Sequence, residues 1–234
     1  MGCFWIQNNL IVVGNKFHKD RLLGKSDMLA SPLVSMQNKS GKPVYTTGQK
    51  SLTRKQADTV VLAANSYEDK MLVLIGFTLG LRRDDIVRVE IQNINFQTNE
   101  FSYLEKKKGN RIKTVPMTER LSNELRMYIS GHTVAGQKYL FPARQKTSAT
   151  GICEYMSSRT AYNIFNTLCK KAGVATPIPI HAMRSTCIKL KQEEGWTIEQ
   201  VAALIGDKAS TVMEHYSTPS TGELAALMKE KGGI

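Results

Sequence analysis

Residues 66–86, SYEDKMLVLIGFTLGLRRDDI, carry the strongest structural signal in the chain. Ser66 can cap a helix by accepting a hydrogen bond from the backbone N–H of Asp69, and an apolar run then continues to Leu79. Gly80 stands where helices commonly end in a left-handed residue. The segment therefore predicts a buried helix that stops just before a group of charged side chains.

Outward from this helix, the sequence predicts further helices on both sides. Thr53 and Gln56 form a capping-box pattern, which recurs at Thr197 and Gln200. The other expected helices follow Thr118, cover residues 154–172, run from His181 to Gly195, and cover residues 221–234.

A small antiparallel sheet is expected between these helices. Apolar residues alternate after Asp85, and segments 95–99 and 107–110 are rich in turn residues. The alternating positions are Val87, Val89, Ile91, Phe101, Tyr103, Ile112, Val115 and Met117. They suggest about three short strands, so the predicted fold class is mainly α with a small antiparallel β-sheet (α+β).

The composition of the chain indicates the kind of partner and the cellular compartment to expect. The 234-residue chain has a formal net charge of +12, which favours a polyanionic partner, although a merely basic soluble protein has the same balance. Four cysteines are present: Cys3, Cys153, Cys169 and Cys187. They form no C-x-x-C pair, so we expect a reducing cytosol and no zinc site. The apolar run at residues 10–13 is too short for a membrane span, and a soluble intracellular protein is expected.

Two charged segments suit phosphate chemistry. Arg82 follows the helix-ending glycine, and Asp85 can hold its guanidinium or cap the next short helix. Lys108 ends a lysine run in the second turn, where an ammonium could give a proton to a departing oxygen. A surface Arg–Asp pair and a solvated hairpin tip are the common alternatives. Further positive charge in this turn comes from Lys106, Lys107, Arg111 and Lys113.

Two later segments add a histidine, a second arginine and a phenol. His181 and Arg184 share one face at a helix start, where free backbone N–H groups also attract anions. Tyr216, preceded by His215, offers a hydroxyl that can act as a covalent nucleophile, although most tyrosines of this kind are packing residues.

In order and spacing, these segments resemble the tyrosine recombinases, also called the phage integrase family, over residues 51–220. The similar segments are Thr78–Ile86 (the first arginine motif), Lys108–Pro116 (the lysine hairpin), His181–Arg184 (H-x-x-R) and Leu204–Gly206 followed by Tyr216.

The resemblance implies a role for each residue in cutting and rejoining DNA without metal, ATP or another cofactor. Tyr216 would attack the scissile phosphate to form a 3′-phosphotyrosyl link, while Arg82 and Arg184 hold the nonbridging oxygens. Lys108 would be the general acid, and His181 would assist proton transfer or hold the phosphate. DNA contacts are expected from Lys106, Lys107, Arg111 and Lys113.

The resemblance also implies double-stranded DNA as partner, a homotetramer on DNA and accessory DNA-bending proteins, in a prokaryotic, viral or mobile-element setting with a cytoplasmic, nucleoid-associated location. Residues 51–220 would be the catalytic domain, and the tail at 221–234 would dock on a neighbouring protomer. Residues 1–50 would be an arm, or the remnant of the family's larger DNA clamp.

One departure concerns the position after Leu-Gly, where the family usually has His or Trp and this chain has Asp207. A carboxylate there would repel phosphate, orient His181 or an arginine, or face away with His215 substituting. Asp85, Asp207 and His215 are therefore auxiliary candidates.

Three other functions stay open at this stage. The chain could be a DNA-binding relative that has lost its chemistry, for which Asp207 is the main argument. It could also be a topoisomerase-like nicking and closing enzyme, or a basic helical interaction protein in which the ordered motifs are a coincidence.

Overall fold

The computed structural model describes residues 51–144, 147–148, 151–152, 154–216, 225 and 228–229, with the backbone alone at residues 147–148, 151–152 and 215–216. The expected arm at residues 1–50 lies outside the described residues, as does most of the expected tail helix at residues 221–234.

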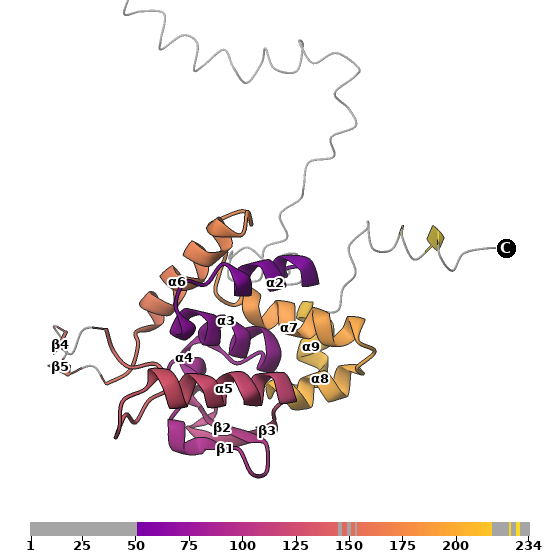
Figure 1. The fold of residues 1–234 in the computed structure, drawn as a ribbon. Coiled ribbons are helices and arrows are strands. Elements are labelled where there is room, and N and C mark those ends of the chain that lie inside the picture. Colours follow the sequence, from indigo (N-terminus) through magenta and orange to yellow (C-terminus); the bar gives the residue numbers. More distant parts are fainter. Residues whose placement is uncertain are drawn as a thin grey trace, which may run out of the picture. The chain divides into compact units, whose positions relative to one another are not determined.

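The described elements follow one another as a mainly helical domain with an early sheet (Figure 1). In chain order they are α2 (Arg54–Leu62), α3 (Tyr67–Leu79), α4 (Arg83–Ile86), the 3₁₀ turn η2 (Ile91–Asn93), β1 (Ile94–Asn95), β2 (Glu100–Glu105), the 3₁₀ turn η3 (Lys106–Lys108), β3 (Arg111–Pro116), α5 (Glu119–His132), β4 (Thr147–Ser148), β5 (Gly151–Ile152), α6 (Ser158–Lys171), α7 (Ala182–Glu193), α8 (Ile198–Ile205) and α9 (Ala209–Tyr216). The predicted fold class is confirmed.

Helix α3 is the centre of this domain. It packs against α2, α5, α6 and α7, and its residues from Met71 to Ile75 are all buried. A side chain at Gly76 would place its Cβ 2.7 Å from Met183 Sδ and 3.1 Å from Met183 Cβ, so the bare glycine lets α7 lie close to α3. The close approach matters because α7 carries the second arginine motif.

Local capping fixes where these helices begin, as the sequence predicts. Thr53 and Thr197 each form a complete capping box, with Gln56 and Gln200 respectively. Ser66 accepts from the backbone N–H of Asp69 at 3.0 Å. The helix expected over residues 154–172 begins four residues later, at Ser158.

The sheet has the antiparallel order β1-β2-β3, with β2 in the middle. Phe101 and Tyr103 of β2 point into the core, and so does Glu105 at its end, while Glu105 pairs in register with Arg111 of β3. The β2–β3 connection contains Lys108, as predicted.

The position of the first strand was predicted wrongly. Val87 lies in the turn after α4, and Val89 follows that turn. The first strand, β1, begins only at Ile94, one residue before the segment 95–99 that was expected to be a turn. Both valines are buried in the core. Glu90, next to Val89, forms an isolated antiparallel bridge with Tyr139, and the Val89 carbonyl accepts a hydrogen bond from the backbone N–H of Leu140 at 2.8 Å. Core packing together with this short bridge, rather than a strand of the three-stranded sheet, therefore accounts for the alternation with polar residues.

In the part of the chain that is described, none of the helices combines the length and the apolar character needed to span a bilayer.

Candidate active site

The Asp207 carboxylate joins the two arginines of the predicted site. Oδ1 accepts a hydrogen bond from Arg82, and Oδ2 accepts one from Arg184 Nη2 at 2.5 Å. Arg82 immediately precedes α4, Arg184 lies in the first turn of α7, and Asp207 follows α8. Three segments far apart in sequence therefore meet at one carboxylate.

Gly80 brings Arg82 to this meeting point. It ends α3 with φ of 61°, and a Cβ there would lie 2.9 Å from Ile205 Cγ2, so both conformation and space require glycine. The Gly80 carbonyl also accepts a hydrogen bond from Arg184 Nη1 at 2.6 Å. The end of α3 thereby fixes both guanidiniums.

Arg184 is almost completely buried, with 1% of its side chain exposed. Its Nη1 and Nη2 atoms have the partners given above, while its Nε has no hydrogen-bond partner among the described residues. Arg82 is more open, at 17%. The arginines beside Asp207 hold the pKa of its carboxyl below the ordinary value in spite of the opposing effect of burial.

Two lysines of the β2–β3 hairpin reach the carboxyl end of α8. Lys108 Nζ donates to the Gly206 carbonyl at 2.5 Å, and Lys113 Nζ donates to the Ala203 carbonyl. Carbonyls at a helix C-terminus favour such cations. Burial, reinforced by neighbouring cations, lowers the pKa of Lys113 to about 8 although Glu105 opposes the shift.

Glu105 is a buried carboxylate that the sequence analysis missed. It is fully buried, and its oxygens lie 3.0 Å from Arg111 Nη2, 3.6 Å from Arg82 Nη1 and 3.7 Å from Lys108 Nζ. Alternation along β2 could have found it, because Phe101, Tyr103 and Glu105 occupy the same inward face. We call Arg82, Glu105, Lys108, Arg184 and Asp207 the charge cluster.

Asp85 ties α4 to the hairpin. It is buried, and its Oδ1 accepts a hydrogen bond from the backbone N–H of Lys106 at 3.0 Å. Burial raises the pKa of its carboxyl in spite of this bond and of the nearby Arg82. Asp85 therefore anchors the start of the lysine run, rather than bridging to a guanidinium directly.

His181 lies at the N-terminal boundary of α7 beside a pocket of about 200 Å³. Arg82, Lys106 and Lys107 also line this pocket. Burial, then the positive charge of Arg184, lowers the pKa of His181 to about 4, although Asp207 opposes the shift. The imidazole is therefore neutral at pH 7.

The remaining predicted residues are placed in part. Lys106, Lys107 and Arg111 are exposed on the hairpin, whereas Lys113 is turned toward α8. Tyr216 is the last residue of α9, which packs against α7 and α8. The side chains of His215 and Tyr216 lie outside the described part of the chain.

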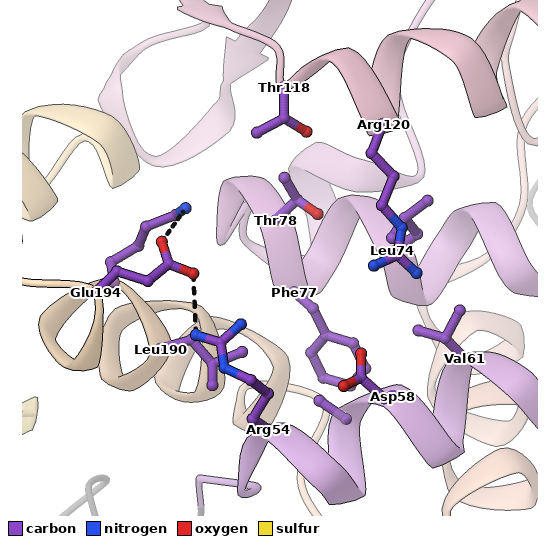
Figure 2. A pocket seen from close by; sticks show the side chains of 12 residues that line it. Arg54, Asp58, Val61, Leu74, Phe77, Thr78, Thr118, Arg120, Leu190 and Glu194 are labelled. Atoms are coloured by element: carbon purple, nitrogen blue, oxygen red, sulfur yellow. Dashed lines mark hydrogen bonds and ion pairs between the residues drawn. The ribbon is translucent and has the colours of Figure 1, made fainter.

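A second pocket, of about 280 Å³, contains none of these predicted residues (Figure 2). It is lined by residues of α2, α3, α5 and α7, and Glu194 at its edge pairs with Arg54 at 3.0 Å. Of the two pockets, only the first is therefore lined by sequence-predicted cations, namely Arg82, Lys106 and Lys107.

Comparisons with known proteins bear on the family and the fold of the chain. Residues 50–222 match the phage integrase family. The chain is similar to the tyrosine recombinase XerA of Pyrococcus furiosus, with 25% identity over 171 residues that cover 72% of this chain and 57% of the relative. The chain thus spans little more than half the length of that curated relative.

Solved structures show the same fold. A crystal structure of XerA recombinase superposes with a TM-score of 0.63 at 18% identity, covering 79% of this chain and 65% of that one. The XerH site-specific recombinase, bound to its difH substrate in a pre-cleavage complex, gives 0.58 at 15% identity, covering 83% of this chain and 60% of that one.

The fold, the order of the motifs and the match over most of the chain define a tyrosine recombinase catalytic domain. The chain belongs to the phage integrase family.

Proposed function

We propose that this chain is a site-specific DNA recombinase that cleaves and rejoins strands through a 3′-phosphotyrosyl intermediate. The observation that carries the proposal is the convergence of Arg82, Lys108 and Arg184, from three segments of the chain, on the neighbouring residues Gly206 and Asp207. Family membership and the net charge of +12 support it.

In the proposed first step, the Tyr216 oxygen bonds to the scissile phosphorus and the bond from phosphorus to the 5′ oxygen breaks. Arg82 and Arg184 stabilise the charge that develops on the nonbridging oxygens. Lys108 gives a proton to the departing 5′ oxygen. The neutral His181 assists proton transfer or holds the phosphate. Rejoining is the reverse, with a 5′ hydroxyl attacking the phosphotyrosine, so the bond energy is conserved and no cofactor is needed.

The proposed substrate is double-stranded DNA, with exposed hairpin residues Lys106, Lys107 and Arg111 on the phosphate backbone. Within this proposal, a homotetramer forms on DNA, accessory proteins bend the DNA, and the setting is the nucleoid of a prokaryote or a mobile element. Residues 51–220 form the catalytic domain, preceded by an arm or clamp remnant at 1–50 and followed by a docking tail at 221–234.

A covalent trapping assay tests the chemistry. Nicked duplexes from the gene's own neighbourhood would be incubated with the protein and separated in denaturing detergent, with Tyr216→Phe in parallel. A shifted band from the parent protein that the phenylalanine variant lacks supports the mechanism. Relaxation of supercoiled plasmids without a particular site would instead favour a nicking and closing enzyme.

One observation favours a second candidate, a DNA-binding relative without chemistry. Asp207 occupies both arginines that the mechanism assigns to the phosphate. Such a relative would bind DNA equally well with tyrosine or phenylalanine at position 216, and it would form no covalent adduct with either.

A further inference from the structure

Two consecutive residues engage all three cations that the proposed chemistry assigns to the phosphate and its leaving group. The Asp207 carboxylate accepts hydrogen bonds from Arg82 and Arg184, and the Gly206 carbonyl accepts one from Lys108 Nζ at 2.5 Å. The turn between α8 and α9 thus presents oxygen atoms to the whole cation set.

The contact with Asp207 leaves neither terminal nitrogen of Arg184 open to a ligand. Both terminal nitrogens of that guanidinium are occupied, one by the Gly80 carbonyl and one by Asp207, and 1% of the side chain is exposed. Among the described residues that line the adjacent pocket, Arg82 is present and Arg184 is not. A phosphate oxygen that entered the pocket would therefore meet Arg82, and it would reach Arg184 only after Asp207 had moved.

A carboxylate resembles a phosphodiester in the feature that arginine recognises. Each offers two oxygens that share a negative charge and accept hydrogen bonds from separate guanidiniums. We propose that Asp207 is an internal stand-in for the scissile phosphate, which masks Arg82 and Arg184 in the DNA-free protein and must swing out before a phosphodiester can bind. The inference rests on the proposed function for the identity of the displacing ligand, though not for the masking itself.

The proposed movement is one of the Asp207 side chain rather than of the backbone. The backbone N–H groups of Gly206 and Asp207 both donate to the Ala202 carbonyl, at 2.9 Å and 3.1 Å, and these bonds hold the chain at the end of α8. Asp207 precedes α9, which begins at Ala209, so its side chain stands in the turn between the two helices.

The competing account keeps Asp207 in place as a positioning residue that holds the arginines while phosphate binds elsewhere on them. The two accounts predict opposite effects of removing the carboxylate charge. Masking predicts tighter anion binding, because a competitor is lost. Positioning predicts weaker anion binding, because the guanidiniums lose their orientation.

The test uses inorganic phosphate as the probe and the full chain. Phosphate affinity would be measured from the rise in thermal midpoint at constant ionic strength, for the parent protein, Asp207→Asn and Asp207→Ser. Asp69→Asn is the matched control, since Asp69 is also a partly buried Asp paired with an arginine, Arg144, at 2.9 Å.

Masking predicts that both Asp207 variants bind phosphate about tenfold more tightly than the parent, and that Asp69→Asn changes affinity by less than about twofold. Adding Arg82→Gln to Asp207→Asn should abolish the gain. Unchanged or weaker phosphate binding in the Asp207 variants would overturn the proposal. If the variants fold only with phosphate present, the anion replaces the lost carboxylate, as masking predicts. Failure of both variants to fold even with phosphate would overturn the proposal.

This readout is independent of strand cleavage. Tighter phosphate binding in the variants, together with no covalent trapping by the parent, would retain the masking and reject the recombinase chemistry. Covalent trapping by the parent, without tighter phosphate binding in the Asp207 variants, would retain the recombinase chemistry and reject the masking.

Discussion

The two ends of α7 hold ion pairs of the same chemical type in different surroundings. In its first turn, Arg184 is 1% exposed and pairs with Asp207, which is 14% exposed. At its C-terminal end, Glu194 pairs with Arg54, whose side chain is 52% exposed (Figure 2). Water screens the exposed pair, whereas loss of one partner in the buried pair leaves a charge without compensation. The same helix therefore carries a costly charge arrangement at one end and an expendable one at the other.

The largest expected effect comes from truncating the buried arginine. Arg184→Ala leaves Asp207 and the Gly80 carbonyl without one of their donors, and we expect a loss of about 3–5 kcal/mol in the free energy of unfolding. Arg54→Ala should cost less than about 1 kcal/mol. Urea unfolding of both variants measures the difference, and similar losses in the two would contradict the comparison.

The second prediction concerns proton transfer. Lys108→Ala should slow strand cleavage by about 10²–10⁴-fold, the range typical of a lost general acid. A substrate with sulfur in place of the 5′ bridging oxygen should restore the rate, because a thiolate leaves without protonation. The control is Lys191→Ala, which lies in the last turn of α7 and outside the charge cluster, and this variant should cleave DNA at the parent rate.

Lys113 provides the alternative outcome of that experiment. Its pKa is lowered to about 8, and its ammonium also reaches the end of α8. Sulfur rescue of Lys113→Ala, without rescue of Lys108→Ala, would transfer the role of general acid to Lys113.

The third prediction compares two glutamates. Glu105→Gln removes the buried charge that lies close to Arg82, Lys108 and Arg111, and it should destabilise the fold by on the order of 2 kcal/mol. Glu194→Gln should stay within about 1 kcal/mol of the parent protein. Chemical unfolding of the pair checks this, and equal stabilities would mean that the charge on Glu105 is dispensable.

The last prediction concerns a pH dependence at the N-terminal boundary of α7. The pKa of His181 is about 4 in the folded protein, below its ordinary value of about 6.5. Between these pH values the unfolded chain binds a proton that the folded protein does not, so stability falls as pH is lowered from about 6.5 to about 4.

His181→Gln should remove this part of the acid sensitivity, on the order of 2 kcal/mol across that window. Thermal unfolding between pH 4 and pH 7 would measure it, with His132→Gln as a control outside the charge cluster. An unchanged pH profile in the His181 variant would show that folding does not lower the pKa of this imidazole.

The sequence predicted the features that depend on neighbouring residues or on ordered motifs. Thr53, Ser66 and Thr197 cap helices through residues three positions away, so their effect is local. The order of motifs correctly indicated the family, and the residues proposed for phosphate do converge. The first strand was misplaced because burial of Val87 imitates strand alternation.

Two features of the charge cluster depend on tertiary packing. Alternation along β2 indicates that Glu105 faces inward, but its contact with Arg82 depends on how the hairpin packs beside α8, where a Cβ at Gly206 would collide with the Glu105 carboxylate. The bridge from Asp207 to both arginines depends on the packing of α3 against α7 and of α7 against α8. From the sequence, Asp207 could repel phosphate, orient His181 or an arginine, or face away. In the folded protein its carboxylate binds both arginines.

The most direct test of the account is to identify the residue that carries DNA after trapping. The covalent complex would be digested with nuclease and protease, and the peptide bearing a residual nucleotide would be sequenced by mass spectrometry. The account predicts a phosphodiester-linked nucleotide on Tyr216. A nucleotide on another residue, such as Tyr155 or Tyr162, would contradict it.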